Sequence, residues 1–327
     1  MLSRRMVWRF IVISGLLFGL LPQPERAQAR NGKIFITISV DWEGRDLDQR
    51  NLTAMSSFRQ RFRTLPLLHF LNAAYFTRPY QDAAKAREKI LSVMRPVDET
   101  GLHIHSWKSL VEASGVDYRH YPKWTPRIYH ESQVLSCAYS DCGHEVPLWA
   151  YSSAEIRKIV RFSKDMLVRK GFDSPVSFRA GGWMADTKVL EVIASEGFRF
   201  DSSSVPTVLF GNQLNGYAIP GWAEQLWPGM SPASQPWPIF YGDQTLIEMP
   251  DNGCLSDYMT GEEMVKVFQK NRELWESRPD QDVYIHFGFH QETAQYYLER
   301  LIYALDRILN EAKSDNLPVY FTTFSDL

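Results

Sequence analysis

The sequence DVYIHFGFH (residues 282–290), followed by QETAQYYLERLIYALDRILNEAK (291–313) and PVYFTTF (318–324), predicts a strand, a helix and a second strand in succession. β-Branched and aromatic residues dominate the first and third segments, as is typical of strands. A strand, a helix and another strand in this order indicate a parallel sheet with a helical crossover. This unit therefore predicts an α/β fold.

The same alternation continues toward the N-terminus. Further strands are predicted at KIFITISV (33–40), AAYFT (73–77), GLHIHSW (101–107), VSFRAGG (176–182), FRFDSSS (198–204) and QTLIEMP (244–250). Helices are predicted at SFRQRFRTLPLLHFLN (57–72), with Pro66 as a possible break, after the capping box SSAE (152–155) and at TGEEMVKVFQKNRELWES (260–277). Seven or eight such units predict a distorted (β/α)7–8 barrel in a single domain. Two long irregular segments, 108–151 and 205–238, exceed ordinary connections and are expected to form functional walls.

Residues 1–29 are predicted to be a secretory signal peptide. The basic MLSRRMVWR precedes the apolar FIVISGLLFGLL, and Ala27–Ala29 form a small-residue cleavage site. An apolar run of 12 residues is short for a membrane span, so no stable membrane anchor is expected after cleavage. The domain is expected to span residues 30–327 and to be periplasmic or secreted. A formal net charge of −2 without a basic run gives no indication of a nucleic-acid partner.

Cys137, Cys142 and Cys254 are the three cysteines of the chain. In an oxidising compartment, Cys137 and Cys142 are expected to form a disulfide that closes a short loop. A structural zinc site is the less favoured alternative, because His144 alone stands nearby as a third ligand. Cys254 is expected to be free and buried.

Chemistry-bearing side chains gather where the predicted strands end. In a (β/α) barrel these carboxyl ends form one face, and active sites lie there. The residues at these ends are Asp41, Glu43, His103, His105, Arg179, Asp201 and His290. His103 and His105 are two apart and share a strand face, although a pair of strand histidines can also simply hydrogen-bond to backbone. His69 lies in an apolar run and is expected to be a packing residue.

This ordered set resembles the polysaccharide deacetylases of carbohydrate esterase family 4. Five motifs match in order, namely DWE, HIH, FRAGGW, FDSSS and GFHQE, over residues 33–325. The resemblance implies metal ligation by Glu43, His103 and His105. It also implies that Asp41 is the catalytic base, Arg179 its orienting partner, His290 the catalytic acid, and Asp201 the partner of His290.

The residue types suit this chemistry. One carboxylate and two neutral imidazoles leave a divalent metal ion, predicted to be Zn²⁺, with open coordination positions. Such an ion acidifies water and polarises a carbonyl. Trp42, Trp107 and Trp183 lie beside the motifs, where they could either contact sugar or pack the barrel rim.

Two departures from the family pattern leave the ligand set open. The metal-binding acid would be Glu43, two residues after Asp41, and the histidines stand closer together than is usual in the family. Asp41, His144 or His286 therefore remain alternative ligands. The predicted function is removal of acetyl groups from an N- or O-acetylated glycan. The alternatives are hydrolysis of another amide or C–N bond on the same scaffold, or glycan binding by a catalytically inactive relative.

Overall fold

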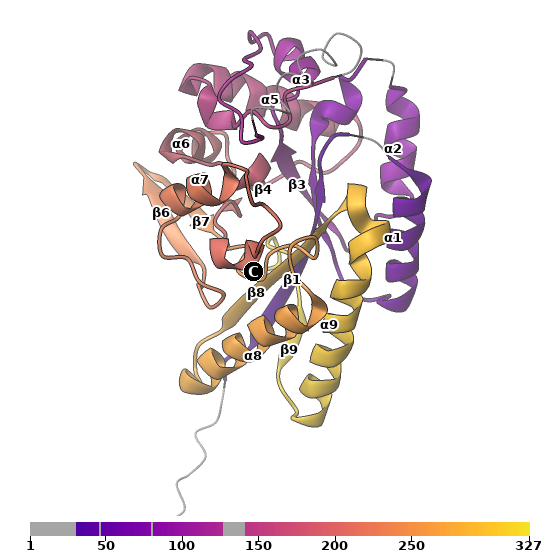
Figure 1. Ribbon diagram of the computed structural model, residues 1–327, viewed down its shortest axis with the longest axis vertical. Coiled ribbons are helices and arrows are strands. Elements are labelled where there is room, and N and C mark those ends of the chain that lie inside the picture. Colours follow the sequence, from indigo (N-terminus) through magenta and orange to yellow (C-terminus); the bar gives the residue numbers. More distant parts are fainter. Residues whose placement is uncertain (1–30, 46, 80, 127–140) are drawn as a thin grey trace, which may run out of the picture.

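A curled, mainly parallel sheet runs through the centre of the molecule (Figure 1). The computed structural model describes residues 31–45, 47–79, 81–126 and 141–327. The nine strands lie in the order β6 (Trp237–Tyr241), β7 (Gln244–Glu248), β5 (Phe200–Asp201), β4 (Ser177–Ala180), β3 (Glu99–Ile104), β2 (Leu68–Leu71), β1 (Ile34–Trp42) and β8 (Val283–His290), with β9 (Val319–Phe321) also paired to β1. Among these strands, β6 and β7 form the one antiparallel pair. The predicted single α/β domain with a distorted barrel is confirmed.

The gap between β7 and β8 is spanned by an irregular segment rather than by another strand. Leu255 forms an isolated parallel bridge with Gly288 of β8. The backbone N–H of Gly253 donates to the carbonyl of His286 at 2.9 Å, and the N–H of Ser256 donates to that of Gly288 at 2.9 Å. The half-barrel is thus closed by the connection that follows β7. This connection brings its side chains to the end of β8.

Helices cover the outer face of the sheet (Figure 1). The helices in the described ranges are α1 (Gln49–Arg61), α2 (Ala83–Leu91), α3 (Lys108–Ala113), α5 (Ser153–Arg169), α6 (Thr187–Ser195), α7 (Ile219–Leu226), α8 (Gly261–Ser277) and α9 (Ala294–Ser314), and of these α7 lies toward the carboxyl ends of the strands rather than on the outer face. The 3₁₀ turns are η1 (Ala73–Phe76), η2 (Leu148–Ala150), η3 (Gly181–Trp183), η4 (Thr207–Phe210) and η5 (Gln291–Thr293). Both predicted capping boxes are present, at the start of α5 and of α8. No helix in the described ranges is long and apolar enough to cross a membrane.

Strand β1 separates the apolar core from the polar interior of the barrel. Ile36, Ile38 and Val40 are fully buried in the apolar core. Ser39 and Asp41 alternate with them and point to the interior, where both contact Arg179. The period of two along a strand therefore brings Asp41 to the inner face, at the carboxyl end of β1 where the sequence predicted it.

Two predicted elements near the N-terminus are wrong. The segment 57–72 is not one helix, because α1 ends at Arg61 and residues 68–71 form β2. The predicted strand AAYFT forms η1 instead, since the side chain of Asn72 accepts a hydrogen bond from the N–H of Ala74 and initiates a turn. His69, now on β2, is fully buried; its Nδ1 accepts a hydrogen bond from Trp42 Nε1 at 3.1 Å and its Nε2 lies 3.2 Å from Asp98 Oδ2, so it packs in the core as part of a polar network.

The cysteine predictions are met in part. Cys254 is free and buried, as predicted. Cys142 is disulfide-bonded, but Cys137 lies outside the described residues, so the pairing of these two stays a prediction. The predicted signal peptide, 1–29, likewise lies outside the described residues.

Candidate active site

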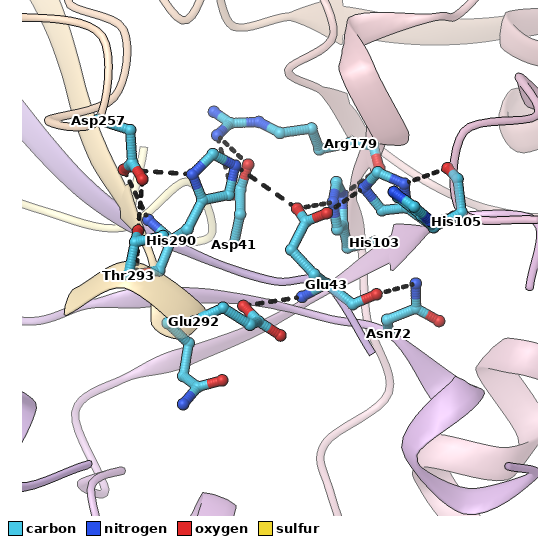
Figure 2. Close-up of polar contacts among 12 residues, drawn as sticks. Asp41, Glu43, Asn72, His103, His105, Arg179, Asp257, His290, Glu292 and Thr293 are labelled. Atoms are coloured by element: carbon cyan, nitrogen blue, oxygen red, sulfur yellow. Dashed lines mark hydrogen bonds and ion pairs between the residues drawn. The ribbon is translucent and has the colours of Figure 1, made fainter. Parts of the chain in front are cut away.

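A cavity of about 100 Å³ opens at the carboxyl ends of β1, β3, β4 and β8. Its lining contains six of the seven predicted site residues, Asp41, Glu43, His103, His105, Arg179 and His290, together with Trp124, His144, Ala180, Gly182, Trp183, Ile219 and Tyr258. In Figure 2 the Glu43 carboxylate lies between the two β3 histidines on one side and His290 on the other. The barrel thus brings together residues from four separate strands.

Glu43, His103 and His105 form the candidate metal-binding group. Glu43 Oε1 lies 3.3 Å from His103 Nε2, and Oε2 lies 2.8 Å from His105 Nε2. One ligand atom from each residue lies within 4.8 Å of the others. One carboxylate and two imidazoles are a donor set that suits Zn²⁺ or a similar divalent ion.

The two imidazoles are oriented by backbone carbonyls. His103 Nδ1 lies 2.9 Å from the carbonyl oxygen of Arg179, and His105 Nδ1 lies 2.6 Å from that of His144. A carbonyl only accepts, so each Nδ1 carries a proton; a protonated ring also donates from Nε2 to Glu43, whereas in the neutral ring the Nε2 lone pair is available to a metal ion. A backbone hydrogen bond of this kind is typical of metal-ligating histidines. His103 and His105 can therefore hydrogen-bond to the backbone through Nδ1 and bind a metal ion through Nε2 at the same time.

The charge state of Glu43 also suits a ligand. Burial raises the pKa of Glu43, but the His105 charge and hydrogen bonds from both histidines outweigh this and hold the pKa well below its ordinary value. Burial lowers the pKa of His105, whereas the neighbouring Glu43 carboxylate raises it above its ordinary value. The cavity thus holds a carboxylate anion that favours a cation between it and the imidazoles.

The backbone around Glu43 is fixed by three side chains. The indole Nε1 of Trp107 donates to the Glu43 carbonyl at 2.7 Å, and Asn72 Nδ2 donates to it at 3.3 Å. Glu292 Oε2 accepts the Glu43 N–H at 3.4 Å (Figure 2). Trp107 is therefore a support for the ligand loop. Trp42, Trp107 and Trp183 are at most 4% exposed, which favours packing over stacking on a sugar at the surface.

Asp41 and Arg179 form a buried ion pair at the floor of the cavity. The Nη1 atom of Arg179 lies 2.9 Å and 3.1 Å from the two carboxylate oxygens of Asp41. The Arg179 guanidinium stacks on Phe70 of β2, with its Cζ 4.6 Å from the ring centroid. A Cβ on Gly101 would approach Phe70 Cδ1 to 2.6 Å, so the glycine before the two histidines makes room for this ring. Arg179 thus stands where the sequence predicted, beside Asp41.

His290 stands at the end of β8, as predicted, but its acidic partner differs from the prediction. His290 Nδ1 lies 3.2 Å from Oδ2 of Asp257, and Nε2 lies 3.5 Å from Glu43 Oε1. Burial lowers the pKa of His290, but the Asp257 charge and hydrogen bond, with further contributions from Glu43 and Asp41, raise it to about 10. Asp257 was missed because it lies in the irregular connection after β7. No local sequence pattern marks Asp257 as the partner of His290, because tertiary contacts set the path of this connection.

Asp201 does not contact His290, and its predicted role as the partner of His290 is wrong. Its carboxylate accepts the hydroxyl of Ser203 at 2.8 Å and the N–H of the same residue at 3.2 Å. It is fully buried beneath the cavity, and burial raises its pKa. Strand β5 contains just Phe200 and Asp201, so Asp201 lies lower in the barrel than a longer strand would place it.

Neither of the alternative histidine ligands joins the metal-binding group. His144 lines the cavity, but its Nδ1 lies 2.9 Å from Glu145 and its Nε2 lies 2.7 Å from Arg45. His286 is buried beside Arg179 and Ser202, and burial followed by the Arg179 charge holds its pKa well below the ordinary value. Asp41 is engaged by Arg179. The described residues therefore favour Glu43, His103 and His105 as the ligands.

These features define an α/β barrel with a polar site at the carboxyl ends of its strands, in which Glu43, His103 and His105 form a donor set for a metal ion. No protein-family model matches the sequence, and no curated protein does so either. The fold is similar to that of a putative polysaccharide deacetylase from Mycobacterium smegmatis, with a TM-score of 0.53 at 13% identity over 90% of this chain and 88% of that one.

Two further solved structures share the fold. A probable polysaccharide deacetylase from Pseudomonas aeruginosa PAO1 has a TM-score of 0.52 at 12% identity, covering 90% of this chain and 89% of that one. The PuuE allantoinase has a TM-score of 0.50 at 13% identity, covering 97% and 96%. The chain therefore has the fold of polysaccharide deacetylases.

Proposed function

We propose that the protein is a metal-dependent hydrolase that removes acetyl groups from an N- or O-acetylated glycan outside the cytoplasm. The observation that carries this proposal is the convergence of three groups in one cavity. They are the Glu43, His103 and His105 set, the Asp41–Arg179 pair and the His290–Asp257 pair. These three groups would supply, in this order, the metal ligands, the general base and the general acid that metal-assisted hydrolysis of an amide or ester requires.

Glu43, His103 and His105 would hold the metal ion, for which Zn²⁺ is our proposal from the donor types. When bound, this ion would polarise the acyl carbonyl and acidify water. Asp41 would accept the proton of the attacking water. Arg179 holds the Asp41 carboxylate in place and favours its ionised form. His290, kept protonated by Asp257, would donate a proton to the leaving amine or alcohol.

The size of the cavity supports a small acyl group as the part that enters. Its volume is about 100 Å³, against roughly 300 Å³ or more for pockets that enclose a drug-sized ligand. A sugar ring would therefore remain at the mouth while the acetyl group reaches Glu43, His103 and His105. The predicted signal peptide supports action in the periplasm or outside the cell, where such glycans occur.

Hydrolysis of another C–N bond is the second candidate, and the observation that favours it is the shared fold of the PuuE allantoinase. The test combines metal analysis of the purified protein with two activity assays. Acetate release from acetylated oligosaccharides supports the first proposal. Hydrolysis of a ureide or another small amide without acetate release supports the second. If the purified protein binds glycan but contains no metal and releases no acyl group, it is an inactive relative of the deacetylases.

A further inference from the structure

A second cavity, of about 380 Å³, lies beside the loop that carries Glu43, and four of its nine lining residues are cationic. We name it the basic cleft. Its lining consists of Arg45, Leu47, Arg78, Pro79, Gln81, Asp82, Lys85, Ala86 and Lys89. Among these residues, four are cationic and one is acidic. The whole chain has a formal charge of −2, so the excess positive charge is a local feature.

Part of this positive charge is neutralised within the described residues, because Arg78 Nε lies 4.0 Å from Asp141 Oδ2, but Arg45 and Lys89 have uncharged partners. Within the part of the chain that the structure describes, the guanidinium of Arg45 has the imidazole of His144 as its hydrogen-bond partner, with Nη2 2.7 Å from Nε2. Lys89 Nζ donates to the neutral carbonyl of Leu47 at 2.8 Å. Asp82 lies 3.9 Å from Lys85 and also accepts the first N–H groups of α2. The described lining therefore keeps positive charge that an external anion could neutralise.

One layer of side chains separates the basic cleft from the catalytic cavity. His144 lines the catalytic cavity, and its Nε2 lies 2.7 Å from Arg45 Nη2 on the cleft side. Trp107 stacks on His144 with ring centroids 5.1 Å apart, and the Arg78 Cζ lies 4.9 Å from a Trp107 ring centroid. Arg78 also donates to the carbonyl of Gly44 at 3.0 Å. The cleft is therefore attached to the loop that positions Glu43.

We propose that the basic cleft binds an anionic group on a sugar near the one that is deacetylated, so that the substrate is an acidic glycan. This inference rests on the proposed function and specifies its substrate class. Arginine forks and lysine ammonium groups bind carboxylate, sulfate and phosphate oxygens through charge-assisted hydrogen bonds. Of the apolar lining residues, Leu47 and Ala86 are buried and Pro79 alone is exposed, which leaves little apolar surface for insertion into a lipid bilayer.

The test uses Lys85→Gln/Lys89→Gln, because both side chains are exposed on α2 and contact no residue of the catalytic cavity. The matched control is Arg307→Gln/Lys313→Gln, which removes the same charge from exposed positions of α9. Titration calorimetry on the full chain measures the affinity for trigalacturonate, for a sulfated trisaccharide and for neutral cellotriose. Acetate release is measured in parallel from acetylated oligogalacturonate and from an acetylated neutral oligosaccharide of equal length.

We expect an acidic trisaccharide to bind more tightly than cellotriose, and the double lysine variant to lose roughly tenfold or more of that affinity. The α9 control should bind as the wild type does. The acidic probe that binds more tightly identifies the anion. In the variant, the KM for the acidic substrate should rise while that for the neutral substrate stays unchanged.

Equal affinity for acidic and neutral trisaccharides would overturn the inference, as would an equal loss in the control. Lysine-dependent binding to phosphatidylglycerol vesicles, without affinity for either acidic trisaccharide, would overturn it too. Lysine-dependent binding of an acidic trisaccharide supports the anion site even if neither acetylated substrate releases acetate. That last result would contradict the proposed function alone.

Discussion

Asp257 contacts His290 twice, once at the imidazole and once at the backbone. Its Oδ2 lies 3.2 Å from His290 Nδ1 and accepts the His290 N–H at 3.4 Å, while its other oxygen accepts the Thr293 hydroxyl. Both the ring and the end of β8 are thus held by one carboxylate. The other ring nitrogen, Nε2, faces the catalytic cavity, where a leaving group would need a proton.

Replacing Asp257 with asparagine should lower the pKa of His290, because the negative charge that favours the imidazolium is removed. If His290 is the acid, the alkaline limb of the pH–rate profile should move to lower pH. Turnover at pH 8 should fall by roughly tenfold or more. Steady-state kinetics between pH 5 and 10 measures both effects.

Asp201→Asn is the control for this prediction, since Asp201 is bonded to Ser203 and does not contact His290. The alkaline limb of the pH–rate profile of Asp201→Asn should lie at the same pH as that of the wild type. A shift in Asp201→Asn with no shift in Asp257→Asn would reinstate Asp201 as the partner of the acid.

The positions of residues at strand ends, together with the resemblance to the deacetylase family, predicted much of this site. Asp41 and His290 pair directly across β1 and β8, and His103 pairs with Arg179 across β3 and β4, so side chains at strand ends meet. Asp257 could not be predicted in this way, because it lies in a connection whose path depends on the long-range bridge of Leu255 to Gly288. Local residue propensity cannot reveal such a bridge, since it depends on tertiary contacts.

Two further predictions from local sequence, the strand AAYFT and the role of Asp201, are wrong. AAYFT has strand-like aromatic residues, but the Asn72 cap and tertiary packing favour η1. Asp201 follows a strand, as a site residue should, yet β5 ends so early that the residue lies beneath the cavity. Short elements of two to four residues depend on tertiary contacts more than on propensity.

His103→Ala and His105→Ala should each lower the metal content of the purified protein sharply, because each removes one of the three expected ligands. Elemental analysis measures the bound metal, and circular dichroism checks that the fold persists. Asp41→Asn is the comparison variant. It should retain metal while losing roughly two to four orders of magnitude in turnover, as expected for a base. Loss of metal in Asp41→Asn would instead make Asp41 a ligand.

The two histidines of β8 should behave differently on substitution. His290→Gln should cut turnover by roughly two to four orders of magnitude without emptying the metal site, because the acid is lost while Glu43, His103 and His105 remain. His286→Gln should retain much more activity, since His286 is buried below the cavity and its pKa is held well below the ordinary value. The reverse pattern in turnover measurements would contradict this assignment of the acid.

The buried Glu145 pair gives a prediction for stability against pH. Glu145 Oε1 lies 2.7 Å from Lys123 Nζ, Oε2 lies 2.9 Å from His144 Nδ1, and its side chain is 1% exposed. Burial alone would raise the pKa of Glu145, but the bonds and charges of His144 and Lys123 lower it to about 2. A carboxyl with a lowered folded-state pKa adds stability above its unfolded pKa of about 4.5 and loses it as pH falls toward 2.

Glu145→Gln should therefore lower the free energy of unfolding by about 3 kcal/mol at pH 7, the value that corresponds to a shift of this size. The difference from the wild type should shrink steadily between pH 4.5 and about 2, because the wild-type carboxyl is then protonated and resembles the amide. Urea unfolding at a series of pH values measures this difference in the free energy of unfolding. Glu112→Gln is the control, since its pair with Lys108 spans 3.9 Å and is half exposed, and it should change stability by less than about 0.5 kcal/mol. A constant difference down to pH 2 would mean that packing, rather than the charge on Glu145, stabilises this wall of the catalytic cavity.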